Sequence, residues 1–140
     1  MMDPFTARQP AGRVTVMPIH YERDDKKRRI LAISEGEVTV HDTLAVIDRQ
    51  VADGAWTYRM LFDTRASPSL PTLEELHLVV RHVGALTTRY GPRGPVALVV
   101  VDPALFEIGG RYARLADLTA LRVGLFGNPR DAEEWLTAMG

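Results

Sequence analysis

The segment Pro95-Val96-Ala97-Leu98-Val99-Val100-Val101-Asp102 decides the fold. Between Pro95 and Asp102 every residue is apolar and most are β-branched, so the segment has no polar face. Such a run is typical of a parallel strand in a sheet that helices cover on both faces. We therefore expect residues 96–101 to form the middle strand of an α/β domain, and Asp102-Pro103 to end that strand.

The clearest helix precedes this strand. Apolar residues between positions 72 and 90 recur at steps of three and four, which is the spacing of one helical face. Thr72 begins the helix, and two glutamates lie in its first turn, where the helix dipole favours them. Gly91-Pro92 ends the pattern, so the helix and the apolar strand are joined by a short connection.

A second helical pattern follows the strand and runs from Leu105 to Leu118. Its weak point is Gly109-Gly110, because each glycine costs about 1 kcal/mol relative to alanine inside a helix. We expect close packing against another backbone to compensate for this cost.

The N-terminal part of the domain predicts a hairpin and a helix. Apolar and polar residues alternate over positions 19–22, and an apolar run resumes over 30–33, so the charged segment 23–29 is expected to be the hairpin turn. Asp42 is expected to cap a helix that ends near Ala52. The other expected elements are a strand over residues 58–62, a strand over 121–126, and a helix that begins at Pro129 after an Asn128 cap.

The resulting order is β-β-α-β-α-β-α-β-α. A hairpin followed by three right-handed crossovers gives a five-stranded mixed sheet, antiparallel at the N-terminal hairpin and otherwise mostly parallel, with four helices packed on it. Residues 1–12 show no apolar period, and we expect residues 1–16 to be a flexible leader, with Met17 as an alternative start. A single domain then covers residues 17–140.

The composition excludes several classes of protein. Of 140 residues, 46% are apolar and 25% are charged, as in a soluble globular domain. The formal net charge of −1 gives no overall attraction to nucleic acid or to an anionic membrane. The absence of cysteine excludes disulfides, thiolate nucleophiles and cysteine-based metal sites. The longest apolar run is too short to span a bilayer, so we expect a cytoplasmic protein.

Three polar residues, Asp63, Asp102 and Asn128, follow expected parallel strands, where ligands collect in open α/β sheets. Two carboxylates near one edge can bind a cation or act in acid–base chemistry, whereas capping and turn formation are the ordinary roles of these residue types. The four histidines lack the spacing of a zinc-binding helix, and no nucleophile elbow or phosphate-binding glycine loop is present. We therefore expect no catalytic residues, no metal and no cofactor.

Four segments carry a resemblance to a known family. They are Pro18-Ile19-His20-Tyr21, Leu61-Phe62-Asp63-Thr64-Arg65, Phe106-Glu107-Ile108-Gly109 and Glu133-Glu134-Trp135-Leu136. Together with the order of the elements, they make residues 17–140 resemble the STAS domain, the module of sulfate transporters and anti-sigma-factor antagonists. The chain is similar in particular to an uncharacterised bacterial branch of small stand-alone proteins that look like such antagonists.

The resemblance implies a non-enzymatic regulatory module that binds a protein partner. In antagonists of this kind, a kinase phosphorylates a serine within Asp-Ser-Ser-Gly at the start of the helix after the third strand. This chain instead has Asp63-Thr64-Arg65-Ala66-Ser67-Pro68-Ser69-Leu70-Pro71-Thr72, so the usual motif is missing and the loop is longer. We expect the loop 63–72 and the helix after it to dock the partner.

Five residues are candidates for this contact. Asp63 and Arg65 are expected to orient the loop, while Ser67, Ser69 and Thr72 are hydrogen-bonding or modifiable positions. A phosphate on Thr72 or Ser69 would lie near a helix N-terminus that favours it, although the two glutamates after Thr72 oppose it. Capping and turn formation are the alternative roles of these hydroxyls.

Other interpretations remain open beside this one. Leu73, Leu78 and Val80 lie outside the main apolar stripe of the 72–90 helix, and they predict a homodimer through a symmetric patch. A small-ligand or lipid-binding domain is the second class of function, because STAS folds look like the CRAL-TRIO architecture. An enzyme that uses Asp63 and Asp102 in a cleft is the third. The cationic segment 23–29 lacks interleaved aromatic residues, so we expect a solvated hairpin tip and no nucleic-acid partner.

Overall fold

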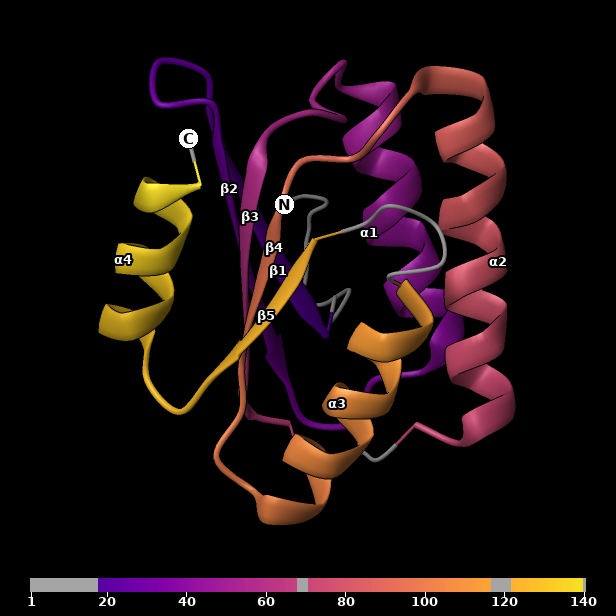
Figure 1. Cartoon of the computed structure of the whole chain (residues 1–140), viewed down its shortest axis with the longest axis vertical. Coiled ribbons are helices and arrows are strands. Elements are labelled where there is room, and N and C mark those ends of the chain that lie inside the picture. The colour runs from indigo at the N-terminus through magenta and orange to yellow at the C-terminus, as the bar shows by residue number, and fades with distance from the viewer. Residues whose placement is uncertain (1–17, 68–70, 117–121, 140) are drawn as a thin grey trace, which may run out of the picture.

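The computed structural model describes residues 18–67, 71–116 and 122–139 (Figure 1). The expected leader, residues 1–16, lies outside the described residues. The order of the elements is the expected one. They are β1 (Ile19–Asp24), β2 (Arg29–Glu35), α1 (Val40–Ala52), β3 (Arg59–Ala66), α2 (Leu73–Tyr90), β4 (Val96–Val99), α3 (Pro103–Ala116), β5 (Val123–Phe126) and α4 (Pro129–Ala138).

The strands form one five-stranded sheet in the order β1-β2-β3-β4-β5. β1 and β2 are antiparallel, and all other neighbours are parallel, so the mixed sheet predicted from the sequence is confirmed. The middle strand is β3, however, and the expectation that residues 96–101 occupy the middle is wrong. Each crossover places the next strand beside the preceding one, so β4 is fourth in space as it is fourth in sequence.

β4 nevertheless has the environment that its apolar sequence predicts. It lies between β3 and β5, and three of its four residues are buried. The strand ends at Val99, two residues earlier than expected. Val100 is still buried, whereas Val101 is 57% exposed because the chain has already left the sheet there.

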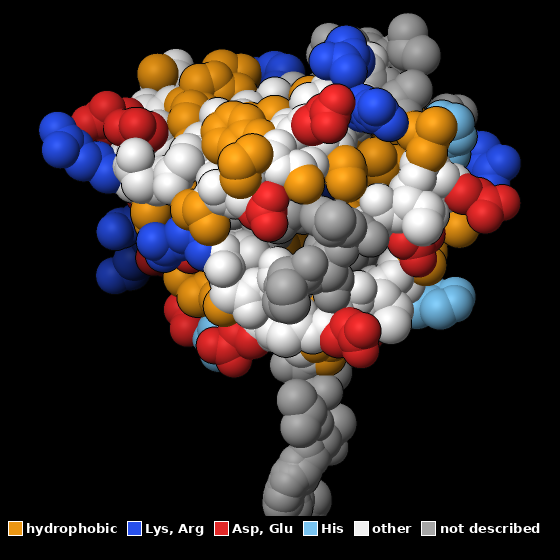
Figure 2. All heavy atoms as spheres, turned by 90° about the horizontal axis from the view of Figure 1, so that it is seen from below, with side chains coloured by type: hydrophobic (Ala, Val, Ile, Leu, Met, Phe, Trp, Pro, Cys, Tyr) orange, Lys and Arg blue, Asp and Glu red, His pale blue; other side chains and the backbone are white. Residues whose placement is uncertain are grey.

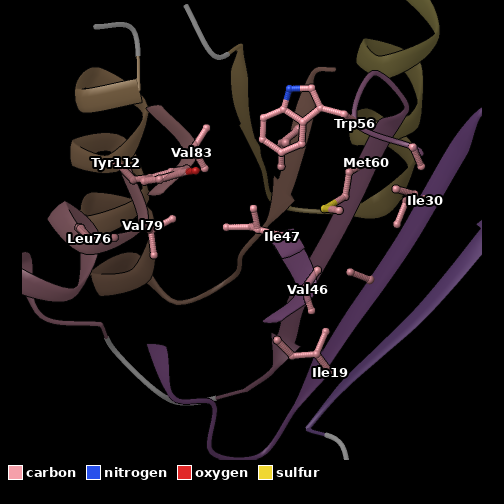
Figure 3. Packing of buried hydrophobic residues seen from close by; sticks show 13 residues of the cluster. Ile19, Ile30, Val46, Ile47, Trp56, Met60, Leu76, Val79, Val83 and Tyr112 are labelled. Carbon is pink, nitrogen blue, oxygen red and sulfur yellow. The ribbon is translucent and has the colours of Figure 1, made fainter. Parts of the chain in front are cut away.

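Helices cover both faces of the sheet (Figure 1). α1, α2 and α3 lie on one face, and α4 lies on the other. Met60 and Leu61, adjacent in β3, point to opposite faces as strand geometry requires. Met60 joins the larger core cluster with Ile47 of α1 and Val83 of α2 (Figure 3), and Leu61 joins the smaller cluster with Leu136 of α4.

The start of α1 differs from the expectation. The N-cap is Thr39, whose hydroxyl accepts a hydrogen bond from the Asp42 amide, and the Asp42 carboxylate accepts one from the Thr39 amide. Asp42 is therefore the acidic partner of a capping box. The expectation that Asp42 is the cap itself is wrong, because the helix begins three residues earlier, with Thr39 as its N-cap. The caps expected for the later helices are confirmed, with Thr72 at α2 and Asn128 at α4.

β3 extends beyond the expected 58–62 strand and ends at Ala66. Pairing with β2 continues to Glu35 opposite Ala66, and the Thr64 hydroxyl donates to the Val99 carbonyl oxygen at 2.8 Å. Asp63, Thr64 and Arg65 are thus strand residues, and the loop expected from Asp63 onward begins only after Ala66.

The glycine pair of α3 has a partner inside the domain. A Cβ added at Gly109 would lie 2.8 Å from Cδ2 of Leu125 in β5, so the missing side chain allows the helix to approach the sheet. The close packing expected at the glycine pair is present at Gly109, but its neighbour is a side chain and not another backbone. Among the described residues, no helix is long and apolar enough to cross a membrane.

Candidate functional site

Asp63 and Arg65 form a rigid charged pair at the carboxyl end of β3. Arg65 donates from Nε to Oδ1 of Asp63 at 3.0 Å and from Nη2 to Oδ2 at 2.8 Å, and its backbone amide also donates to Oδ1 at 3.1 Å. This bidentate geometry fixes both the position and the plane of the guanidinium group. The strand supplies the frame, because residues two apart in a strand point to the same face.

The two groups differ in burial: the Asp63 carboxylate is mostly buried and holds the Arg65 guanidinium, which is partly exposed. The Asp63 side chain is only 12% exposed, whereas the Arg65 side chain is 45% exposed. The hydrogen bonds from Arg65 lower the pKa of Asp63 below its ordinary value, and the carboxylate in turn raises the pKa of Arg65. The sheet therefore presents a permanently charged, oriented guanidinium to solvent.

Two of the candidate hydroxyls, those of Ser67 and Thr72, bond to backbone groups just after β3 and at the start of α2. Ser67 is 6% exposed and donates to the Gly36 carbonyl oxygen at 2.6 Å. The Thr72 hydroxyl accepts from the Glu75 amide at 3.0 Å, while the Glu75 carboxylate accepts from the Thr72 amide at 2.9 Å. Ser69 lies outside the described residues. The hydroxyls of Ser67 and Thr72 thus have structural partners in this conformation.

The other polar residues at this edge cap helices. Oδ1 of Asp102 accepts from the Ala104 amide at 2.8 Å at the start of α3, and Oδ1 of Asn128 accepts from the Asp131 amide at 2.9 Å at the start of α4. Each group is used by its own segment, as the capping alternative predicts. Within residues 18–67, 71–116 and 122–139, no three histidine or acidic side chains are grouped as they are around a metal ion.

Large apolar side chains are exposed where α2 and α3 begin. Leu73 is 49% exposed in the first turn of α2, and Phe106 is 39% exposed in the first turns of α3. Val101, in the connection that leads into α3, is also exposed. Figure 2, which views the molecule from this edge, shows hydrophobic side chains gathered among scattered charges of both signs.

The charged hairpin turn is tied to its surroundings. Arg23 contacts the carboxylates of Asp25 and Asp53 at 3.0 and 3.3 Å, and Arg28 donates to the Thr57 hydroxyl at 2.9 Å. The turn is thus a solvated tip whose arginines have protein partners.

A cavity of about 180 Å³ lies between the sheet and the three helices of its first face. Figure 3 shows Val79 and Tyr112 pointing toward Ile47 across this layer. Most of the lining is aliphatic. It extends from Thr64 and Pro71 at the carboxyl end of the strands, past Ile47, Val79 and Leu98, to Arg93 just before β4.

Arg93 is the functional candidate that sequence patterns do not reveal. It lies in Gly91-Pro92-Arg93-Gly94-Pro95, a composition typical of a surface turn, yet it is only 4% exposed. A Cβ at Gly94 would overlap the carbonyl oxygens of Thr57 and Tyr58, so this glycine lets the segment pass against the start of β3. The only local sequence pattern around Arg93 is two glycines and two prolines, and this pattern does not indicate that the arginine is buried.

No protein-family model matches the sequence, and no curated protein matches it. Solved structures do match. An anti-sigma factor antagonist from Mycobacterium paratuberculosis is 17% identical with a TM-score of 0.52, and the alignment covers 88% of this chain and 97% of that one. An uncharacterized protein from Shewanella loihica, of the DUF3478 family and with a SpoIIAA-like fold, is 21% identical with a TM-score of 0.49, and the alignment covers 84% of this chain and 91% of that one. The chain therefore has the fold of an anti-sigma factor antagonist, as the STAS resemblance predicts.

Proposed function

We propose that this chain, which has the fold of an anti-sigma factor antagonist, is a non-enzymatic regulatory module that binds a protein partner. The contact surface is the edge of the sheet formed by the end of β3 and the first turns of α2. The observation that carries the proposal is the Arg65 guanidinium, which Asp63 fixes in two places while it stays 45% exposed. A charged group held in one orientation loses little side-chain entropy on binding, so it is well suited to recognise a carboxylate of a partner.

Apolar side chains support the same surface. Protein interfaces combine exposed apolar anchors with polar groups at their rim, and arginine is enriched in them. Leu73 and Phe106 belong to segments that follow neighbouring parallel strands, so both begin at the edge that carries Arg65. The similar solved structure is named an anti-sigma factor antagonist, and we infer a partner of the anti-sigma-factor type for this chain.

Recognition in this proposal does not depend on the usual phosphorylation motif. Asp-Ser-Ser-Gly is absent, and Thr72, at the start of α2, uses its hydroxyl in a capping box with Glu75. A phosphate at Thr72 would break that capping box and lie beside the Glu75 carboxylate, which opposes it by like charge. Ser67 then contributes by holding the end of β3 against Gly36, Thr72 contributes by capping α2, and Ser69 stays a candidate contact.

The test is partner capture by tagged full-length protein from the native host. Arg65→Gln removes the guanidinium, and Leu73→Asp places a charge in the apolar part of the surface. Arg89→Gln is the matched control, because Arg89 is an exposed arginine in the last turn of α2, at the opposite end of that helix from Leu73. The proposal predicts that a co-purifying protein is lost with either of the first two variants and kept with the control. Equal capture by all three variants places the contact elsewhere.

We also propose a cytoplasmic homodimer, for which the exposed apolar residues of α2 are the support. Leu78, five residues after the start of the helix, is 37% exposed, and a two-fold pairing of α2 through this side would cover it. Light scattering at high micromolar concentration should give twice the monomer mass, and Leu78→Glu should lower it. A monomer mass for the unmodified chain at that concentration contradicts the dimer.

A further inference from the structure

The cavity between the sheet and α1, α2 and α3 contains a buried cation at one end. Arg93 is only 4% exposed and lines the cavity. Among the described residues, no carboxylate forms an ion pair with it. Its contacts are a hydrogen bond from Nε to Oε1 of Gln50 at 2.9 Å, a contact from Nη2 to the Met60 sulfur at 3.6 Å, and the face of the Trp56 ring at 5.4 Å.

These contacts leave the charge of Arg93 uncompensated. A guanidinium carries five N–H donors, whereas a neutral amide oxygen and a weakly accepting thioether satisfy only part of them. Burial of a charge without a counter-ion is costly, and burial accordingly lowers the pKa of Arg93. An anion that reaches this position would supply the missing counter-ion and further hydrogen-bond acceptors for the guanidinium.

The rest of the cavity is lined mostly by aliphatic side chains, which favour an anion whose remaining part is apolar. Ile47, Val79 and Leu98 line its middle, and the volume of about 180 Å³ slightly exceeds the approximately 150 Å³ of an engineered apolar cavity that binds benzene. Space of this size holds a body of about six to eight carbons.

We propose that this cavity binds a small monocarboxylate with an apolar body, whose carboxylate pairs with the guanidinium of Arg93. The charges along the lining favour a monoanion over a phosphate monoester, because Arg93 is the one cation among the described lining residues. The one acidic lining residue, Glu75, lies in the first turn of α2 at the opposite end and is engaged by the Thr72 amide. The Arg93 end of this site lies before β4, whereas its other end, at Ser67 and Glu75, borders the surface proposed for the protein partner.

The first test compares ligands on the unmodified full-length chain. Octanoate and 1-octanol share their apolar body and differ in the charged group, and isothermal titration gives the Kd of each. We expect octanoate to bind about tenfold or more tightly than 1-octanol, because a charge-assisted hydrogen bond contributes that much in a buried site. Equal binding of the two ligands, or no binding of either at millimolar concentration, overturns the proposal. Tighter binding of hexyl phosphate than of octanoate overturns the carboxylate assignment.

The second test changes the cation. Arg93→Met removes the charge and keeps an unbranched side chain of similar length, and loss of an unpaired buried charge need not prevent folding. We expect this variant to lose about tenfold or more in octanoate affinity while its 1-octanol affinity stays within about twofold. Val79→Phe, which fills the cavity, should weaken the binding of both ligands. Arg130→Gln, outside the cavity, should weaken the binding of neither. If octanoate binds the Arg93→Met variant as tightly as it binds the unmodified chain, the proposed pairing of the carboxylate with Arg93 is contradicted.

Discussion

Arg93 and Gln50 share a buried hydrogen bond in which the Arg93 Nε donates to Oε1 of Gln50 at 2.9 Å, although the two residues are 43 positions apart. Gln50 is completely buried, and its Nε2 donates to the carbonyl oxygens of Ala55 and Trp56 at 2.9 and 3.3 Å. One side chain of α1 thus ties the turn before β3 to the segment before β4. This polar link fixes the position of the cation at the end of the cavity.

Replacing Gln50 with leucine should destabilise the protein by about 2–3 kcal/mol, because two carbonyl oxygens and a charged donor lose their buried partner. Urea unfolding followed by circular dichroism measures the change. The double variant Gln50→Leu with Arg93→Met should cost less than the sum of the single variants, since the guanidinium is no longer left without its acceptor. Strict additivity would show that the two side chains do not depend on each other.

Gly94→Ala should destabilise the protein by about 2–3 kcal/mol, because the new Cβ would overlap backbone atoms of Thr57 and Tyr58 that cannot rotate away. Gly127→Ala is the control, since nothing lies within 4 Å of a Cβ there and it should change stability by about 0.5 kcal/mol or less. Thermal unfolding of both variants under one set of conditions gives the comparison. A Gly94→Ala protein as stable as the control would contradict the close approach.

The Asp63–Arg65 pair predicts a stability difference that depends on pH. Because Arg65 lowers the folded-state pKa of Asp63, the pair stabilises the protein above the unfolded-state pKa of about 4, and this contribution disappears as the pH falls through the folded-state value. Arg65→Gln should therefore be less stable than the unmodified chain at pH 7, and the gap should narrow below about pH 4. Urea unfolding at several pH values tests this, and a gap that stays constant to pH 2 would refute it.

The raised pKa values of three tyrosines predict how the stability of the protein changes at alkaline pH. Burial and the nearby Asp53 raise the pKa of Tyr21 from 10.0 to about 12. A hydrogen bond to Asp25 raises the pKa of Tyr58, and burial raises that of Tyr112. Raised folded-state values stabilise the protein below the unfolded-state pKa of 10.0, and this contribution is lost as the pH rises from 10 toward 12. Phenolate absorbance should rise at higher pH in the folded chain than in the urea-unfolded chain. Coincident titrations of the two states would contradict the raised pKa values.

The layered fold could be predicted from particular residues. The apolar residues of β4 indicated a covered parallel strand, and the 72–90 periodicity with Thr72 at its start indicated α2. The middle position of β3 could not be predicted, because its sequence includes Asp63 and Arg65, which pattern rules place in a loop. These two residues bond to each other, and this local pairing allows polar side chains to stay in the ladder.

The candidate site was predictable only in part. The resemblance makes Asp63 and Arg65 candidates because it points to the segment after the third strand, and the structure pairs these two side chains. Thr39 was missed as a cap because Asp42, three residues later, has the same preference for helix starts. Arg93 was missed because its burial depends on the close approach at Gly94 and on Gln50, a contact between distant segments that no local pattern contains.

The most direct test of the proposed function is hydrogen–deuterium exchange of the full-length chain alone and with its captured partner. The account predicts slower exchange at the end of β3 and in the first turns of α2, with α4 unchanged. Protection confined to α4, or no protection around Arg65, would contradict the proposed contact surface.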